Sequence, residues 1–181
     1  MRRKVAPLIG LVAVLSIALP VAGCGEEEGE DALESVEGEP LEVGELIYNV
    51  AITRFLNPNT TEDAQYLEGL PEEPPGQSYL GVFLRIDNES DEEVSSAQNY
   101  AVTDASDRVY EPVETDSQYA LEIGALIPSD GEIPSPDTTA AAGPTQGALL
   151  LFLVEDDVSE ERPLELEVNG VLGEGTVELD I

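Results

Sequence analysis

The chain lacks most of the side chains on which enzymes rely. It contains no histidine, no tryptophan and a single cysteine, Cys24, among 181 residues. Without an imidazole there can be no Ser-His-Asp triad, and zinc sites generally need histidine or cysteine. A lone cysteine cannot form an intrachain disulfide, so packing alone must hold the fold together. We therefore expect a protein that is not an enzyme and that carries no cofactor.

Positive charge is also scarce. The sequence has seven lysine and arginine residues against 39 acidic ones. Three of the seven, Arg2, Arg3 and Lys4, lie at the N-terminus, so four arginines and no lysine remain beyond them. Nucleic acid is excluded as a partner, because the remaining chain cannot neutralise phosphates.

The N-terminal segment has the pattern of an export signal. A basic head is followed by uncharged, mostly apolar residues from Val5 to Gly23, as in secretory signal peptides. An uncleaved membrane helix is the alternative, since about 18 apolar residues can just span a bilayer. Pro20 argues against a helix that continues to the end of the segment. We assign residues 1–23 to a signal peptide.

The end of this signal, Val21-Ala22-Gly23-Cys24, resembles the lipobox of bacterial lipoproteins. The resemblance implies that the thiol of Cys24 is joined to diacylglycerol and that the peptide is cut before it. It predicts a protein anchored by lipid to the extracytoplasmic face of the cell membrane. In a two-membrane cell, Gly25 after the cysteine favours passage to the outer membrane.

The stretch that follows is rich in glutamate and glycine and has no strand or helix period. Such a composition cannot bury enough apolar surface to fold, and its like charges keep it extended. We interpret residues 24–45 as an acidic flexible linker, able to reach about 70 Å at full stretch. A spacer is favoured over an acidic binding tail, and the folded domain is expected over 46–181.

Short apolar runs bounded by Gly, Pro, Asn or Asp indicate strands in that domain. The expected strands cover 46–55, 78–86, 99–103, 108–113, 148–154, 164–168 and 176–181. The run 148–154 is apolar on both faces and is expected in the centre of a sheet. The stretch 119–127 is ambiguous between strand and short helix. About seven strands without a long helix predict an antiparallel Ig-like β-sandwich.

Three segments carry a further resemblance: "YLGVFLRIDNES", "YAVTDASDRVYEP" and "GPTQGALLLFLV". They are similar to bacterial Ig-like domains of unknown function related to the mycobacterial immunoprotective secreted antigen. The resemblance implies an exported or lipid-anchored binding module without common catalytic residues, and a Tyr110 that packs across a hairpin. Asp107 stands where that family usually has glycine, and aspartate tolerates a left-handed backbone.

Two acidic runs, 87–93 and 155–161, fall in expected loops. The candidate calcium ligands in them are Asp87, Glu89, Asp91, Asp156 and Asp157. Neither run has the ligand spacing and central glycine of an EF-hand. Solvated turns are the simpler interpretation, and a Ca²⁺-responsive acidic surface domain is the alternative function.

The connection 56–77 is longer than a compact domain normally needs. Its residues Tyr66, Leu67 and Leu70 form either a binding loop or a cover for a sheet edge. The six tyrosines could likewise include a recognition patch, although cross-strand packing explains them equally well. The favoured function is a membrane-anchored, non-enzymatic binding module whose partner is an envelope or surface protein.

Overall fold

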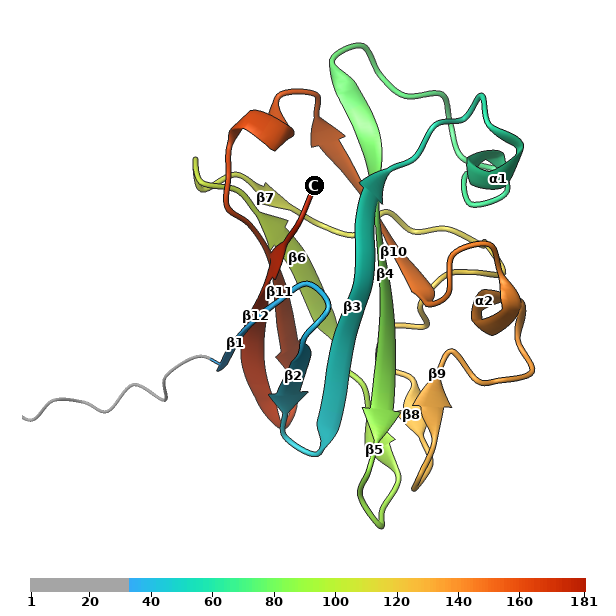
Figure 1. Ribbon diagram of the computed structural model, residues 1–181, viewed down its shortest axis with the longest axis vertical. Coiled ribbons are helices and arrows are strands. Elements are labelled where there is room, and N and C mark those ends of the chain that lie inside the picture. The colour runs from blue at the N-terminus through green and yellow to red at the C-terminus, as the bar shows by residue number, and fades with distance from the viewer. Residues whose placement is uncertain (1–32) are drawn as a thin grey trace, which may run out of the picture.

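A computed structural model describes residues 33–181 and confirms an all-β sandwich (Figure 1). The expected signal peptide, Cys24 and the acidic residues up to position 32 lie outside the described part. Among residues 33–181 both α-helices have four residues, and no helix there is long and apolar enough to cross a bilayer.

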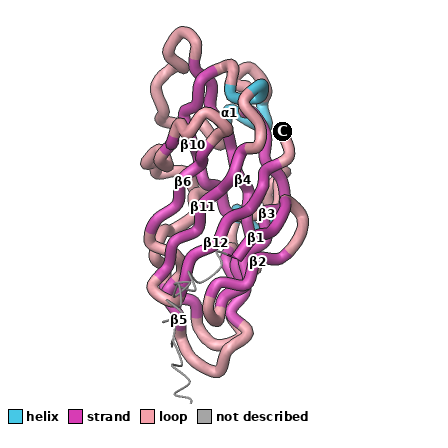
Figure 2. Tube along the Cα trace, turned by 90° about the vertical axis from the view of Figure 1, so that its left-hand side faces the viewer, coloured by secondary structure: helices cyan, strands magenta, loops and turns pink. Residues whose placement is uncertain are grey.

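Two five-stranded sheets make up the sandwich, and Figure 2 shows most of the first of them in face view. The first sheet has the order β1 (Leu33–Val36), β12 (Gly173–Leu179), β11 (Leu164–Gly170), β6 (Asn99–Thr103) and β7 (Val109–Tyr110). The second has the order β10 (Ala148–Glu155), β4 (Gln77–Asn88), β3 (Leu46–Phe55) and β2 (Pro40–Val43), with β9 (Glu132–Ile133) paired to the end of β4. A small third sheet joins β5 (Val94–Ser95) to β8 (Leu126–Ile127).

Three short helices lie in the connections: α1 (Thr61–Ala64), α2 (Thr139–Ala142) and a 3₁₀ turn over Val158–Glu160. All strand pairs are antiparallel except β1 with β12, which is parallel. The ambiguous stretch 119–127 is irregular and ends in β8, and the expected strand 108–113 is reduced to β7.

Alternating side chains of β4 fill two separate cores. Leu80, Val82, Leu84 and Ile86 are all fully buried between the two sheets. Tyr79 and Phe83 point to the opposite face, where they join a second buried cluster. The period-2 alternation of a strand accounts for this division, and the sequence of 78–86 shows the same alternation of residues.

Strand β10 is the outermost strand of its sheet, but backbone hydrogen bonds and two isolated bridges pair its outer side with the segment 112–121. The expectation of a central strand is therefore correct in that both sides are paired, and wrong in that no regular strand lies on the outer side. Its two apolar faces have another cause. Leu150, Phe152 and Val154 belong to the core between the sheets, whereas Leu149 and Leu151 belong to the second core. The apolar run 148–154 therefore reflects burial of side chains on both faces of the strand. Such burial does not require a regular strand on each side of it within the sheet.

The folded domain begins at least 13 residues before the expected position. Residues 33–45 form β1, β2 and their turns, and Leu41 and Val43 of β2 are only 2% and 3% exposed. The Glu37 carboxylate accepts hydrogen bonds from Thr53 N of β3 (3.0 Å) and Asp180 N after β12 (3.0 Å). One carboxylate thus ties β3 of one sheet to the end of β12 in the other, and the expected linker over 24–45 is wrong in its second half.

Candidate functional site

The long connection folds onto the outer face of the second sheet. It contributes to a second buried core whose members are Leu56, Tyr66, Leu67, Tyr79, Phe83, Tyr119, Ala140, Leu149 and Leu151, with Leu70 packed beside it. Tyr66 is 0% and Leu67 8% exposed. These side chains cover the face of a sheet rather than the expected sheet edge, and Leu70 stays partly exposed. A binding loop formed by Tyr66 and Leu67 would first have to unfold from this core.

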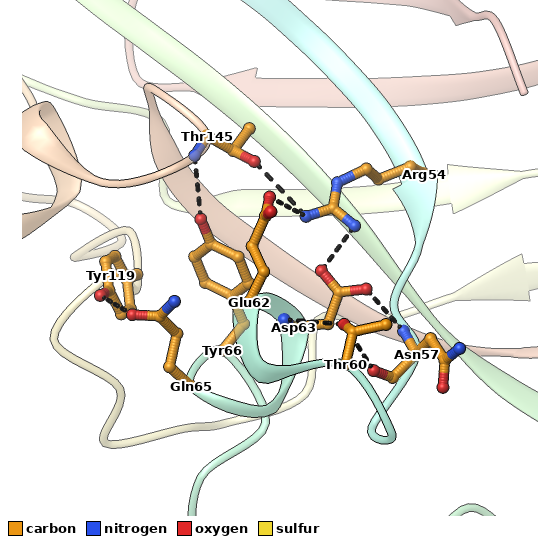
Figure 3. Close-up of polar contacts among 9 residues, drawn as sticks. All are labelled: Arg54, Asn57, Thr60, Glu62, Asp63, Gln65, Tyr66, Tyr119 and Thr145. Atoms are coloured by element: carbon orange, nitrogen blue, oxygen red, sulfur yellow. Dashed lines mark hydrogen bonds and ion pairs between the residues drawn. The ribbon is translucent and has the colours of Figure 1, made fainter.

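A cluster around Arg54 fastens this connection to β3 (Figure 3). The guanidinium binds Asp63 of α1 at 2.6 Å, Glu62 at 3.5 Å and the Thr145 hydroxyl at 3.4 Å. The second oxygen of Asp63 accepts a hydrogen bond from Asn57 N at 2.9 Å. Residues from two other stretches of the chain, around Asp63 and Thr145, therefore converge on one arginine.

Aromatic rings complete the cluster. The Tyr66 ring meets Phe83 and Tyr119 edge-on, at centroid distances of 5.1 and 4.7 Å. The Arg54 guanidinium lies 5.5 Å from the Phe83 centroid, which is within the range of a cation–π contact. The Tyr66 hydroxyl accepts a hydrogen bond from Thr145 N at 3.1 Å, and the Tyr119 hydroxyl donates one to Gln65.

The electrostatics of Asp63 suit a structural role. Burial raises the pKa of its carboxyl, but the hydrogen bonds from Asn57 N and Arg54 together outweigh burial, so the pKa is held below its ordinary value. Asp63 therefore stays ionised near neutral pH, with hydrogen bonds to both of its oxygens. The Arg54 cluster thus fixes the connection in place.

A second cluster fixes the turn between β6 and β7. Arg108 binds the buried Asp104 at 2.6 Å and Asp157 at 2.9 Å. The Tyr110 hydroxyl donates to the same Asp104 oxygen as Arg108, at 3.0 Å, and Tyr110 pairs across the hairpin with Val102. Burial raises the pKa of Asp104, but hydrogen bonds from Arg108, Ser106 and Tyr110 lower it further than burial raises it.

The backbone at this turn has the conformation expected from the sequence. Asp107 adopts a φ of 59°, in the left-handed region that aspartate tolerates. Asp107 N donates to Asp104 O at 2.9 Å, and Asp104 N donates to Arg108 O at 3.1 Å. The packing of Tyr110 across the hairpin likewise agrees with the expectation.

The candidate calcium ligands are not brought together. Asp156 accepts from the Ser78 hydroxyl at 2.7 Å, at the start of β4, whereas Asp87 lies near the end of that strand. Nine residues along a strand separate these two points by about 30 Å. Within residues 33–181 there is no group of three or more acidic or cysteine side chains that could hold a metal ion.

The loop that contains Glu89 and Asp91 is organised by an asparagine. Asn88 is 1% exposed, and its amide nitrogen donates to the backbone oxygens of Glu92, Ile127 and Pro128 at 2.8–3.0 Å. A hollow of about 470 Å³ lies beside this loop and is lined in part by Asp87 and Glu89. The amide thus occupies three carbonyl oxygens of the kind that a bound Ca²⁺ would use.

All six tyrosines are buried, with exposures between 0% and 8%. They are Tyr48, Tyr66, Tyr79, Tyr100, Tyr110 and Tyr119. Cross-strand and core packing therefore accounts for every one of them, and they form no exposed recognition patch.

Comparison with known proteins supports the β-sandwich fold, but no family and no function. No family model matches the chain, and neither does any curated protein. The chain is similar to an uncharacterised β-sandwich protein of Clostridium difficile 630, with 12% identity and a TM-score of 0.50 over 86% of this chain and 99% of that one. No finding links it to the mycobacterial antigen, so the Ig-like family assignment stays a prediction.

Two structures from Bacillus subtilis are more distant. The yjhA protein has 12% identity and a TM-score of 0.49 over 81% of this chain and 99% of its own. The protein ycdA of Bacillus subtilis subsp. subtilis str. 168, described as a candidate lipoprotein, has 12% identity and a TM-score of 0.49 over 81% of this chain and 39% of its own.

Proposed function

We propose that the chain is a lipoprotein, anchored through Cys24 at the extracytoplasmic face of a cell membrane, whose Ig-like β-sandwich binds an envelope or surface protein without catalysing a reaction. The observation that carries the proposal is the motif Val21-Ala22-Gly23-Cys24 at the end of an uncharged apolar segment. Two acyl chains suffice for stable anchoring where one is marginal.

The side chains of the sandwich support a non-enzymatic role. Within residues 33–181 each of the four arginines contacts a carboxylate within 4.0 Å, and neither lysine nor histidine is present. The buried carboxylates of Asp63 and Asp104 are occupied by arginine and by backbone N–H groups. These paired charges support the fold and the solubility of the domain. Recognition of a partner would then depend on the shape of the domain and on its loops.

Metabolic labelling with an alkyne fatty acid tests the anchor. The wild-type chain is expected to take up the label and to fractionate with membranes, and Cys24→Ala is expected to do neither. Equal labelling of Cys24→Ala, or an unlabelled wild type, would refute the lipoprotein assignment. Cys24→Ser serves as the matched control, because it keeps the size and polarity of the side chain and removes only the thiol.

The binding role needs a separate experiment. The full-length lipoprotein, crosslinked in intact cells and then solubilised, is expected to recover a specific envelope protein. The control is a chain cut after residue 32, which keeps the anchor and lacks the sandwich. Recovery of the same proteins by both chains would refute a binding role of the sandwich and would leave the anchor untouched.

A further inference from the structure

The turn between β11 and β12 exposes two adjacent apolar side chains. Val171 is 74% and Leu172 49% exposed, and they form the one adjacent pair among the large exposed hydrophobic residues of the described chain. Turns of this kind usually carry Gly, Asn, Asp or Ser. Neither residue adopts a positive φ, which Gly173 takes instead at 151°. The turn conformation therefore gives no reason for Val and Leu at its tip.

The turn lies beside the point where the described chain begins. Leu33, the first residue of β1, pairs with Gly175, two residues beyond the start of β12. Two residues along a strand correspond to about 7 Å. Leu33 is itself 47% exposed. Figure 1 shows β1 beside β12 on the same side of the sandwich.

The chain between the lipid attachment point, Cys24, and the first described residue, Leu33, is short. Eight residues, 25–32, separate Cys24 from Leu33, and at full extension they span about 30 Å. The 12 residues of β4 alone extend for about 40 Å. A lipid on Cys24 therefore keeps Leu33 within about 30 Å of the bilayer. This distance is shorter than the domain is long, so the β11–β12 turn beside Leu33 also stays near the bilayer.

The turn itself is uncharged, although acids flank it. Residues 168–173, "VNGVLG", contain no charged side chain, whereas the exposed Glu174 follows directly, and Gly44, which lies beside Leu172, is followed by the exposed Glu45. An anionic lipid surface repels acidic side chains, so the turn suits a weakly charged surface. Exposed Val and Leu gain free energy when they leave water for the boundary of the acyl chains.

We propose that the Val171–Leu172 turn is the surface of the sandwich that faces the bilayer, and that both side chains enter the interfacial region of a weakly charged lipid surface. The inference rests on the proposed lipid anchor at Cys24. It gives the domain a preferred orientation on the membrane, with the turn between β6 and β7 directed away from the lipid.

The experiment uses the full-length lipidated protein in phosphatidylcholine vesicles. Because Cys24 is joined to lipid, Leu172→Cys adds the only free thiol, which is labelled with an environment-sensitive fluorophore. Val109→Cys is the matched control, since Val109 is 61% exposed and belongs to β7. Val109 pairs with Thr103, which pairs with Glu165 at the far end of β11 from the turn. Spin-labelled lipid is expected to quench the fluorophore at position 172 at least about twofold more strongly than at position 109.

Flotation of the vesicles separates the inference from the anchor. Protein that floats with the vesicles but is quenched equally at both positions overturns the orientation and leaves the anchor standing. Protein that carries no lipid and does not float overturns both. As a second variant, Val171→Asp combined with the label at position 172 is expected to reduce the quenching to that of the control. Undiminished quenching would show that the turn is not held at the surface by its own side chains.

Discussion

Replacing Asp63 by asparagine removes the charge from the buried side of the Arg54 cluster and preserves the shape of the side chain. The Asp63 carboxylate binds Arg54 at 2.6 Å and accepts from Asn57 N at 2.9 Å. Breaking one partner out of a buried pair costs about 3–5 kcal/mol. Here Arg54 is 25% exposed and retains Glu62, so we expect Asp63→Asn to lower the free energy of unfolding by about 2–4 kcal/mol.

The neighbouring carboxylate supplies a matched control. Glu62 binds the same guanidinium, but at 3.5 Å and with a side chain that is 53% exposed. Exposed ion pairs contribute little, so Glu62→Gln is expected to change the free energy of unfolding by less than about 0.5 kcal/mol. Urea denaturation of the unlipidated chain from residue 25 onward measures both values, provided that the dependence on urea concentration stays the same.

The effect of pH gives an independent check. Because the folded-state pKa of Asp63 is lowered, its contribution is present above the pKa of the unfolded state, near 4, and is lost as the pH falls through the folded-state value. The difference between wild type and Asp63→Asn should therefore be constant from pH 6 to 8 and should shrink on acidification below about 4. Equal losses in both variants, or a difference that grows in acid, would refute this account.

Further predictions concern the two cores and the charge of the domain. Leu41→Ala should lower the free energy of unfolding by about 2–5 kcal/mol, because β2 belongs to the core; a loss below about 0.5 kcal/mol, as expected for an exposed linker residue, would refute that. Tyr66→Ala should cost about 3–5 kcal/mol and Tyr66→Phe about 1, since phenylalanine loses only the hydrogen bond from Thr145 N; equal losses would contradict the second core. Calorimetry should show a melting temperature that rises between 0.05 and 1 M NaCl, as the Debye length falls from above 10 Å to about 3 Å; a constant value would mean that the acids repel one another too weakly. Isothermal titration with Ca²⁺ should give no saturable site, because no three acidic side chains gather into a cation site within residues 33–181; a saturable isotherm lost in Asp87→Asn would contradict this.

The central strands could be predicted because the residue pattern of each strand shows which of its faces is buried. The strand expected over 46–55 coincides with β3, and the alternation of 78–86 assigns the side chains of β4 to the correct faces. A strand with one face in a core carries a period of two in its sequence, and no knowledge of its neighbours is needed. The fold class follows from several such strands together.

The start of the domain could not be predicted, since its determinants are remote in sequence. Strand β1 pairs with β12, about 140 positions later. The Glu37 carboxylate, which reads as one more acid in an acidic stretch, accepts hydrogen bonds from Thr53 N and Asp180 N. The composition of the segment resembles that of a linker, because it does not show which carboxylate is hydrogen-bonded in the folded domain.

The Arg54 cluster was missed although part of its signal is present. Thr60 followed by Asp63 matches the start of a helix, and in the structure the Thr60 hydroxyl accepts from Asp63 N at 3.2 Å and caps α1. This pattern could have identified the helix. It could not have identified Arg54 as the partner of Asp63, because the packing of Tyr66 against Phe83 brings the two together.

The arginines explain why the remaining acids matter for orientation. Within residues 33–181 each arginine contacts a carboxylate of a loop, a short helix or a short strand, or one near the C-terminus; these carboxylates include Asp63, Glu132, Asp104 and Asp180. The positive charge of the arginines is thus paired inside the fold. The acidic residues that outnumber the arginines face solvent. Around such a domain like charges resist approach to an anionic surface from most directions. A lipid on Cys24 would supply proximity without orientation, whereas the uncharged Val171–Leu172 turn, close to Leu33, would supply the orientation. Proximity and orientation therefore depend on different residues, and each can be removed without the other.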